Sequence, residues 1–172
     1  MPGIIDVVSF KNKVAIVGKS TYEIMQARQN LTCSYGSDAP LESNETHQAW
    51  FDAGMKSDKA TVQRKDGDFA KAISEATKVI EATYECPFIS HSPMEPMNFF
   101  AHVKEDQVEL IGPTHTPDSA RVQTADLLGI PKENISVEIT RLGGGFGRRL
   151  RADYVLEAVQ ISKKMRAPVK VT

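Results

Sequence analysis

Four glycines within five positions, at residues 143, 144, 145 and 147, constrain this chain more than any other feature. The surrounding stretch, residues 141–149, reads Arg-Leu-Gly-Gly-Gly-Phe-Gly-Arg-Arg and lies between an alternating strand pattern and an amphipathic helix pattern. Glycine tolerates positive φ and allows the backbone to approach a ligand closely. Backbone N–H groups before a helix, together with two arginines, suit an anion such as phosphate or pyrophosphate. The alternative interpretation is a tight strand-to-helix turn whose arginines are simply solvated.

Two well-known glycine loops do not fit this stretch. A P-loop requires Gly-Lys-Ser/Thr, whereas Gly147 is followed by Arg148 and Arg149. The dinucleotide fingerprint requires Gly-x-Gly-x-x-Gly and an acidic residue roughly 20 positions later, and neither condition is met here. A serine-hydrolase elbow, Gly-x-Ser-x-Gly, is missing from the sequence.

The remaining pattern predicts interleaved strands and helices, and therefore an α+β fold of mixed sheets with packed helices. Ser20 and Glu23 form a capping-box pattern for the first helix. The polar stretch 36–66 indicates turns and linker, with one short helix inside it. Expected strands span 7–10, 14–17, 31–35, 79–86, 99–103, 107–111, 135–140 and 168–171, and expected helices span 22–30, 44–54, 69–76, 116–128 and 151–165.

Composition excludes several classes of protein. The 21 basic and 22 acidic residues give a net charge of -1, which disfavours nucleic acid as a partner. The sequence contains no apolar run of the roughly 18 residues that a membrane span requires. Cys33 and Cys86 cannot supply a four-thiolate metal site, and we expect two buried free thiols. The four histidines show no metal-ligand spacing, so no residue is predicted to bind a metal directly.

A second motif, His-Ser-Pro-Met-Glu-Pro-Met-Asn, occupies residues 91–98. Its two prolines predict an ordered extended turn. Glu95 is a charged group between Met94 and Pro96, which makes it either an acid with a shifted pKa or a partner for backbone N–H groups or an arginine. We favour the structural role, and we expect His91 to be a hydrogen-bonded structural residue.

Five short motifs occur in a characteristic order: Met-Glu-Pro-Met-Asn at 94–98, Gly-Pro-Thr at 112–114, Leu-Gly-Ile at 128–130, the glycine stretch, and Pro-Val-Lys-Val at 168–171. This set resembles the molybdenum-binding large subunit of the xanthine dehydrogenase and aldehyde oxidase family, and most of all the isoquinoline 1-oxidoreductase beta subunit. The resemblance implies that residues 1–36 end an α/β hammerhead domain, 37–68 form a linker, and 69–172 begin the molybdopterin-binding domain.

The resemblance also implies a chemistry and a set of partners. Family members hydroxylate an electron-poor carbon with water as the oxygen source, using a molybdenum–molybdopterin cofactor whose cytosine dinucleotide form is one candidate. Electrons leave through [2Fe-2S] clusters, which this branch carries in a small partner subunit. The implied cofactor-binding residues are Gly144, Gly145, Phe146, Gly147, Arg148 and Arg149, with the Gly147 N–H as a donor, and the substrate-pocket candidates are Met94 and Glu95.

Departures from the family pattern narrow the expected substrate. Where many relatives have Gly-Gln-Glu-His with a glutamine facing molybdenum, residues 88–91 read Phe-Ile-Ser-His. Leu150 stands where purine-oxidising relatives have a glutamate, so we expect an N-heteroaromatic or aldehyde substrate rather than a purine.

The family's base glutamate lies beyond this chain, and both ends resemble cuts inside a larger subunit. We therefore expect no catalytic residue here and no activity from the isolated chain. Two alternatives are a stand-alone anion- or nucleotide-binding module that uses residues 143–149, and a purely structural domain. The sequence does not indicate a cellular location.

Overall fold

The computed structural model describes residues 1–34, 36 and 42–172. They form two compact units: Met1–Leu31 together with Phe88–Thr172, and Thr32–Pro87. The chain is a mixed α+β protein with two sheets and five α-helices in its described part, as expected. The predicted domain boundaries near residues 36 and 68 stay predictions.

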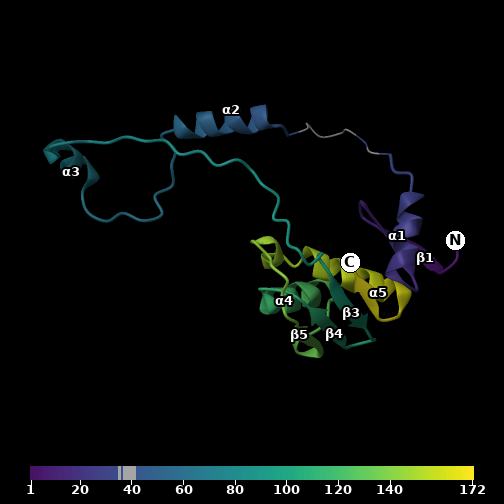
Figure 1. Ribbon diagram of the computed structural model, residues 1–172. Helices are drawn as coiled ribbons and strands as arrows, with labels where there is room; N and C mark the ends of the chain where they lie inside the picture. The colour runs from purple at the N-terminus through teal and green to yellow at the C-terminus, as the bar shows by residue number, and fades with distance from the viewer. Residues whose placement is uncertain (35, 37–41) are drawn as a thin grey trace. The chain divides into compact units, whose positions relative to one another are not determined.

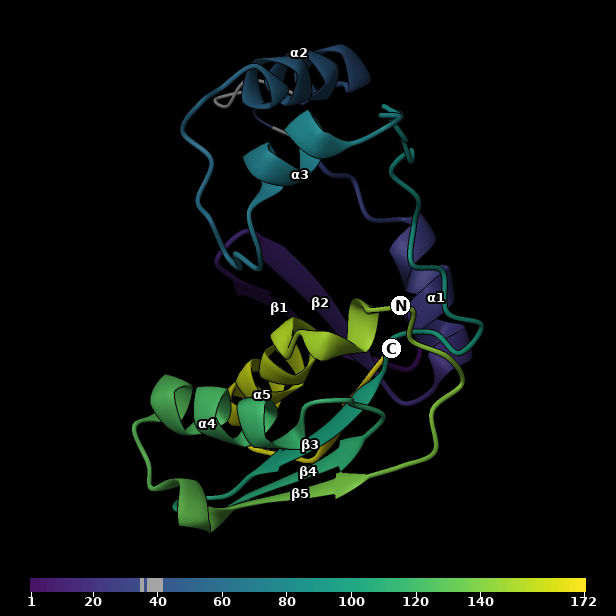
Figure 2. The same ribbon diagram turned by 90° about the vertical axis from the view of Figure 1, so that its left-hand side faces the viewer.

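A four-stranded sheet of order β5-β4-β3-β6 forms the centre of the first unit (Figure 2). Strands β3 (Phe99–Val103) and β4 (Val108–Gly112) make the expected antiparallel hairpin. Strand β6 (Val169–Val171) pairs antiparallel with β3, whereas β5 (Ile135–Ile139) runs parallel to β4. The parallel pair requires a crossover, which the helix between β4 and β5 provides.

Helices α4 (Pro117–Leu128) and α5 (Asp153–Met165) lie on one face of this sheet (Figure 2). A short 3₁₀ turn, Lys132–Asn134, leads from α4 into β5. Between β5 and α5 the chain makes the glycine-rich connection, which closes with a second 3₁₀ turn, Arg148–Leu150. The order of elements therefore places the glycine stretch after a strand and before a helix, as the sequence predicts.

The core between helices and sheet consists of apolar side chains at the alternating positions of the strands and on one side of α5. Gly112 allows the Phe99 ring to approach the backbone closely, because a Cβ there would lie 2.5 Å from the ring. Tyr154 meets the same ring edge-on, with 5.7 Å between centroids. The buried cluster comprises Phe99, Ala101, Val108, Leu110, Ala120, Ile135, Ala152, Tyr154, Val155, Ala158 and Val159.

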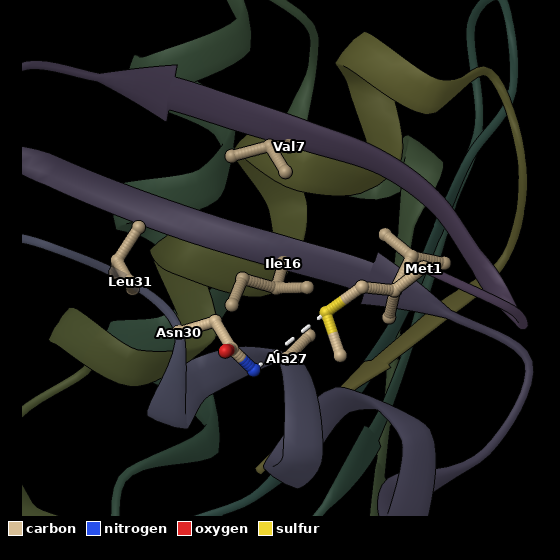
Figure 3. Close-up of a pocket in the computed structure, with 7 residues that line it drawn as sticks. Met1, Val7, Ile16, Ala27, Asn30 and Leu31 are labelled. Atoms are coloured by element: carbon tan, nitrogen blue, oxygen red, sulfur yellow. Dashed lines mark hydrogen bonds between the residues drawn. The ribbon is translucent and has the colours of Figure 1, made fainter.

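The N-terminal part of this unit is a hairpin of β1 (Ile4–Phe10) and β2 (Lys13–Gly18) followed by α1 (Thr21–Gln29). The side chain of Ser20 caps α1 by accepting from the Glu23 N–H, as the capping pattern predicts. Figure 3 shows the cavity of about 250 Å³ beneath this hairpin, where the Met1 side chain points toward Ala27 and Asn30. An ion pair between Lys13 and Glu157 joins the hairpin to α5.

The second unit contains α2 (Asn44–Met55) and α3 (Phe69–Glu75), joined by irregular chain (Figure 1). Both helices were expected, and Ser43 and Asp68 cap them through their side chains. The expected strand at 79–86 is wrong, and so is the one at 31–35 over its described residues 31–34; Tyr35 lies outside the described residues. Neither stretch has a partner strand among the described residues, and a lone strand cannot satisfy its backbone groups.

The cysteines differ from expectation as well. Cys33 and Cys86 are free, as predicted, but both are exposed rather than buried. Both lie in the second unit, where every described residue except the half-buried His47 is exposed, so that unit has no core to receive them. Across the described ranges, no helix is long and apolar enough to cross a membrane.

Candidate functional site

The glycine stretch folds into a tight turn with positive φ at consecutive positions. Phe146 has φ 49°, and Gly147 has φ 89° and ψ −22°. The Arg148 N–H donates to the Gly145 carbonyl across 2.8 Å, which closes a four-residue turn around these two positions. Positive φ at both central residues is the geometry of a type I′ turn, in which glycine is the preferred second residue and phenylalanine is an unusual first one.

The turn leaves a row of backbone donors without a partner in the described chain. Within the described chain, the N–H groups of Gly144, Gly145, Phe146 and Gly147 donate no hydrogen bond. The N–H groups on either side are used, since that of Gly143 donates to a carboxylate and that of Arg148 closes the turn. Four adjacent N–H groups without a partner in the described chain are available to an acceptor from outside it. The loop can therefore hold an oxygen-rich or anionic group by main-chain contacts.

Arg149 lies beneath the loop and is completely buried, with 0% of its side chain exposed. Its Nε donates to the Gly144 carbonyl over 2.8 Å, and its Nη1 donates to the Pro113 carbonyl over 3.4 Å. Its Nη2 donates to both the carbonyl and the Oε2 of Glu95, at 3.0 and 2.9 Å. The guanidinium thus joins three segments of chain that are far apart in sequence, and it fixes the underside of the loop.

Glu95 joins the Met-Glu-Pro motif to the glycine loop. Its Oε2 accepts from the Gly143 N–H at 2.8 Å as well as from Arg149, and its Oε1 accepts from Asn98 at 3.0 Å. A Cβ at Gly143 would lie 2.5 Å from the Cβ of Glu95, so only glycine permits this approach. These arrangements match the structural interpretation of Glu95, and its assignment to a substrate pocket stays a prediction.

The hydrogen bonds to Glu95 favour its charged form. Donation from the Gly143 N–H and from Asn98, with the positive charges of Arg149 and Lys170, holds the pKa of Glu95 below its ordinary value despite partial burial. The carboxylate is therefore ionised near neutral pH and balances the charge of the buried guanidinium.

Arg148 is also paired. Its two Nη atoms each donate to one carboxylate oxygen of Asp153 at 2.8 Å, and its guanidinium lies 5.8 Å from the centroid of the Tyr154 ring. The bond to Asp153 raises the pKa of Arg148. For Asp153, burial opposes ionisation, but the contacts with Arg148 outweigh it and the pKa of Asp153 is lowered. Since each arginine already has a carboxylate partner, the geometry favours main-chain donors over arginine charge as the ligand-facing groups.

A cavity of about 440 Å³ opens beside the loop and is lined by Ile89, Ser90, His91 and Phe146. The Phe146 side chain is 72% exposed, whereas Gly145 is buried and a Cβ there would lie 2.8 Å from the His115 ring. The His91 Nδ1 lies 2.6 Å from the Phe146 carbonyl oxygen. Nothing in the sequence joins His91 to the loop, because a contact across 55 positions leaves no local pattern.

The candidate residues fall into two groups in the structure. The N–H groups of Gly144, Gly145, Phe146 and Gly147 are without a partner in the described chain. The side chains of Glu95, Arg148 and Arg149 are instead held in ion pairs around the loop. Met94 is 93% exposed, and no hydrogen bond or ion pair involving it occurs among the described residues. No cluster of three or more metal-ligating side chains occurs in the part of the chain that the structure describes.

Comparison with known proteins identifies relatives of this chain. The family model for the molybdopterin cofactor-binding domain matches residues 51–172. The aldehyde oxidoreductase molybdenum-binding subunit PaoC of Escherichia coli O157:H7 is 35% identical over 113 residues, which are 64% of this chain and 15% of that protein. The isoquinoline 1-oxidoreductase subunit beta of Brevundimonas diminuta is 24% identical over 191 residues, covering 99% of this chain and 23% of that protein.

A solved structure shares the fold. The crystal structure of quinoline 2-oxidoreductase from Pseudomonas putida 86 superposes with a TM-score of 0.62 at 21% identity, over 91% of this chain and 21% of that one. The chain thus spans between about a seventh and a quarter of the length of these relatives. Because the family model covers well over half of the sequence, and the glycine loop lies within the match, the chain belongs to the molybdopterin cofactor-binding domain family.

Proposed function

We propose that this chain contributes the cofactor-facing glycine loop of a molybdenum hydroxylase large subunit. The row of unpaired N–H groups at residues 144–147 is the observation that carries this proposal. A molybdopterin cofactor is rich in oxygen and nitrogen acceptors, and adjacent main-chain donors on a glycine turn suit such a group. When bound, the cofactor supplies the two-electron redox chemistry by which such enzymes insert oxygen from water into a substrate.

In this proposal some residues of the chain bind the cofactor and others position the loop. The N–H groups of Gly144, Gly145, Phe146 and Gly147 bind and orient the cofactor. Arg149 acts beneath the loop as a positioning residue rather than as a ligand of the cofactor, because its donors are already committed to Gly144, Pro113 and Glu95. Arg148 is also a positioning residue, because its guanidinium is paired with Asp153. No residue of this chain acts as the base.

The substrate is proposed to be an N-heteroaromatic compound or an aldehyde. The names of the relatives support this class, since they include an aldehyde oxidoreductase subunit and an isoquinoline oxidoreductase subunit. The exposed side chains of Phe146 and Leu150 are apolar, and Leu150 offers no carboxylate to a purine. Met94 is proposed as a further apolar wall of the substrate pocket, with Glu95 supporting it from behind.

The proposal extends to the rest of the enzyme. The remainder of the large subunit would supply the base and further cofactor contacts, and a small [2Fe-2S] subunit would accept the electrons. Residues 1–36, with the β1–β2 hairpin and α1, are proposed to end an α/β hammerhead domain. The cytosine dinucleotide form of the cofactor is the proposed pterin.

Gly147→Ala in the complete enzyme tests the loop assignment. A left-handed conformation costs a non-glycine residue about 1–2 kcal/mol, so we expect the alanine loop to relax out of this turn in the free protein and the retained molybdenum to fall by up to about 30-fold. Gly54→Ala is the matched control, since a Cβ at that position meets nothing within 4 Å and its φ is not positive. Molybdenum is measured by mass spectrometry of the purified protein.

The isolated 172-residue chain provides the second test. We expect no substrate-dependent dye reduction from it, because the base lies elsewhere. Dye reduction by the isolated chain would overturn the proposal that the base lies in the rest of the large subunit. Equal molybdenum in the Gly147→Ala and Gly54→Ala enzymes would overturn the proposal that the loop binds the cofactor.

A further inference from the structure

The contact between His91 and the glycine loop constrains one particular peptide group. The Phe146 carbonyl lies 2.6 Å from Nδ1 of His91. A carbonyl oxygen can only accept a hydrogen bond, so Nδ1 carries the proton and donates it. In the neutral ring this fixes the tautomer with hydrogen on Nδ1 and leaves Nε2 as an acceptor.

The Phe146 carbonyl and the Gly147 N–H belong to the same planar trans peptide and point in opposite directions. Turning this peptide over would convert a type I′ turn into a type II′ turn and would reverse both groups. A hydrogen bond to the carbonyl therefore also sets the direction of the N–H. The Gly147 N–H has no acceptor in the described chain. The hydrogen bond from His91 to the Phe146 carbonyl therefore orients the Gly147 N–H, because both groups belong to one rigid peptide.

Phe146 has φ 49°, and both turn types require a positive φ at this first central position. The backbone conformation of Phe146 therefore does not choose between the two turn types, and the hydrogen bond from His91 can. The His91 ring also lies near Gly147, since a Cβ added there would be 3.4 Å from Cε1. The ring is thus hydrogen-bonded to one central residue of the turn and close to the other.

We propose that His91 is a positioning residue which, as its Nδ1–H tautomer, fixes the Phe146–Gly147 peptide so that the Gly147 N–H faces the ligand. This inference deepens the proposed function and rests on it for the identity of the ligand. The orientation of the peptide itself does not depend on that identity. His91 also lines the cavity beside the loop.

Two measurements on the purified 172-residue chain test the inference without any cofactor. Nitrogen-15 NMR of the histidine rings reports the tautomer, with the His91 signals assigned by their loss in His91→Phe. We expect the Nδ1–H form. Hydrogen exchange at Arg148, whose N–H closes the turn, and at Leu150, whose N–H donates to the Gly147 carbonyl in the following 3₁₀ turn, reports its stability. We expect His91→Phe to accelerate that exchange about two- to tenfold, the range of one neutral hydrogen bond.

The control variants separate positioning from general destabilisation. His91→Asn keeps a short side-chain donor and should restore part of the protection. His47→Phe, in the other unit, should leave exchange at Arg148 unchanged. Exchange at Leu110 in the core should stay the same in every variant. An Nε2–H tautomer in the wild-type chain, or unchanged turn exchange in His91→Phe with the core intact, would overturn the inference.

Molybdenum content of the complete enzyme then links the turn to the ligand. We expect His91→Phe to lose molybdenum and His91→Asn to keep most of it. If the wild-type enzyme holds molybdenum and His91→Phe holds equally much, the positioning role fails while the proposed function stands. If the wild-type enzyme holds none, the proposed function fails, and the tautomer and exchange results still decide the geometry.

Discussion

Removing the Glu95 carboxylate should destabilise the chain by leaving the Arg149 guanidinium buried without its counter-charge. The Oε2 atom accepts two hydrogen bonds, from Gly143 and Arg149, at 2.8 and 2.9 Å. Hydrogen bonds to charged groups contribute about 1.5–3 kcal/mol each, and breaking a buried ion pair costs about 3–5 kcal/mol. Because 30% of the Glu95 side chain is exposed, solvent screens part of the loss. We expect Glu95→Ala to lower the free energy of unfolding by about 2–4 kcal/mol.

Glu95→Gln isolates the contribution of the charge. The amide keeps one acceptor oxygen. Its NH₂ group would face either the Asn98 amide or the Gly143 N–H, and in both cases a donor would meet a donor. We expect a loss of about 1–2 kcal/mol, between wild type and the alanine variant. Asp153→Asn is the matched control, since it breaks the partly exposed pair with Arg148 and should cost no more than about 1 kcal/mol.

Urea unfolding at pH 7, followed by circular dichroism, measures these differences, with equal m-values required for a valid comparison. The pH dependence gives an independent check. The pKa of Glu95 is lowered on folding, so its contribution is present above its ordinary value near 4.5 and is lost as the pH falls through the folded value. The gap between wild type and Glu95→Gln should therefore shrink below about pH 4.5. A Glu95→Ala variant as stable as Asp153→Asn at pH 7 would refute the reasoning.

The other predictions concern the core, the turn and a helix cap. Leu110→Ala removes a fully buried side chain and should lower the free energy of unfolding by about 2–5 kcal/mol in the same urea assay. Gly147→Ala should destabilise the isolated chain by about 1–2 kcal/mol, measured as a shift in the urea midpoint, and a neutral result would contradict the left-handed conformation. Ser20→Ala removes the α1 cap and should cost about 0.5–2 kcal/mol locally, seen as faster amide exchange at Glu23.

The sequence alone predicted the elements whose signals are local. The β3–β4 hairpin follows from alternation on either side of a charged turn, and α4 follows from its proline entry and its glycine end. The cap at Ser20 follows from a hydroxyl group just before a helical stretch. Each of these signals acts within a few residues, so no knowledge of the tertiary structure is needed to read it.

The wrong predictions concern residues whose structure depends on contacts with distant parts of the chain. Residues 79–86 have the composition of a strand, but no other strand of the described chain pairs with them. Cys33 and Cys86 were expected inside because thiols are usually buried, yet they lie in a unit without a core. The same limit applies to the site, where Glu95 and Arg149 meet across 54 positions. The sequence indicated that Glu95 seeks a partner, but the geometry was needed to identify that partner.

The hydrogen bonds of the buried Arg149 side chain have a consequence for the order of folding. Its hydrogen bonds reach back 36 and 54 positions, to Pro113 at the end of the β3–β4 hairpin and to Glu95 before it. Bringing such distant segments together costs chain entropy, so we expect these contacts to form after the local β3–β4 hairpin. On that expectation, residues 143–147 reach their conformation late in folding. A ligand that recognises this turn will bind the finished fold in preference to partly folded chain, and its binding energy will add to the stability of the native state.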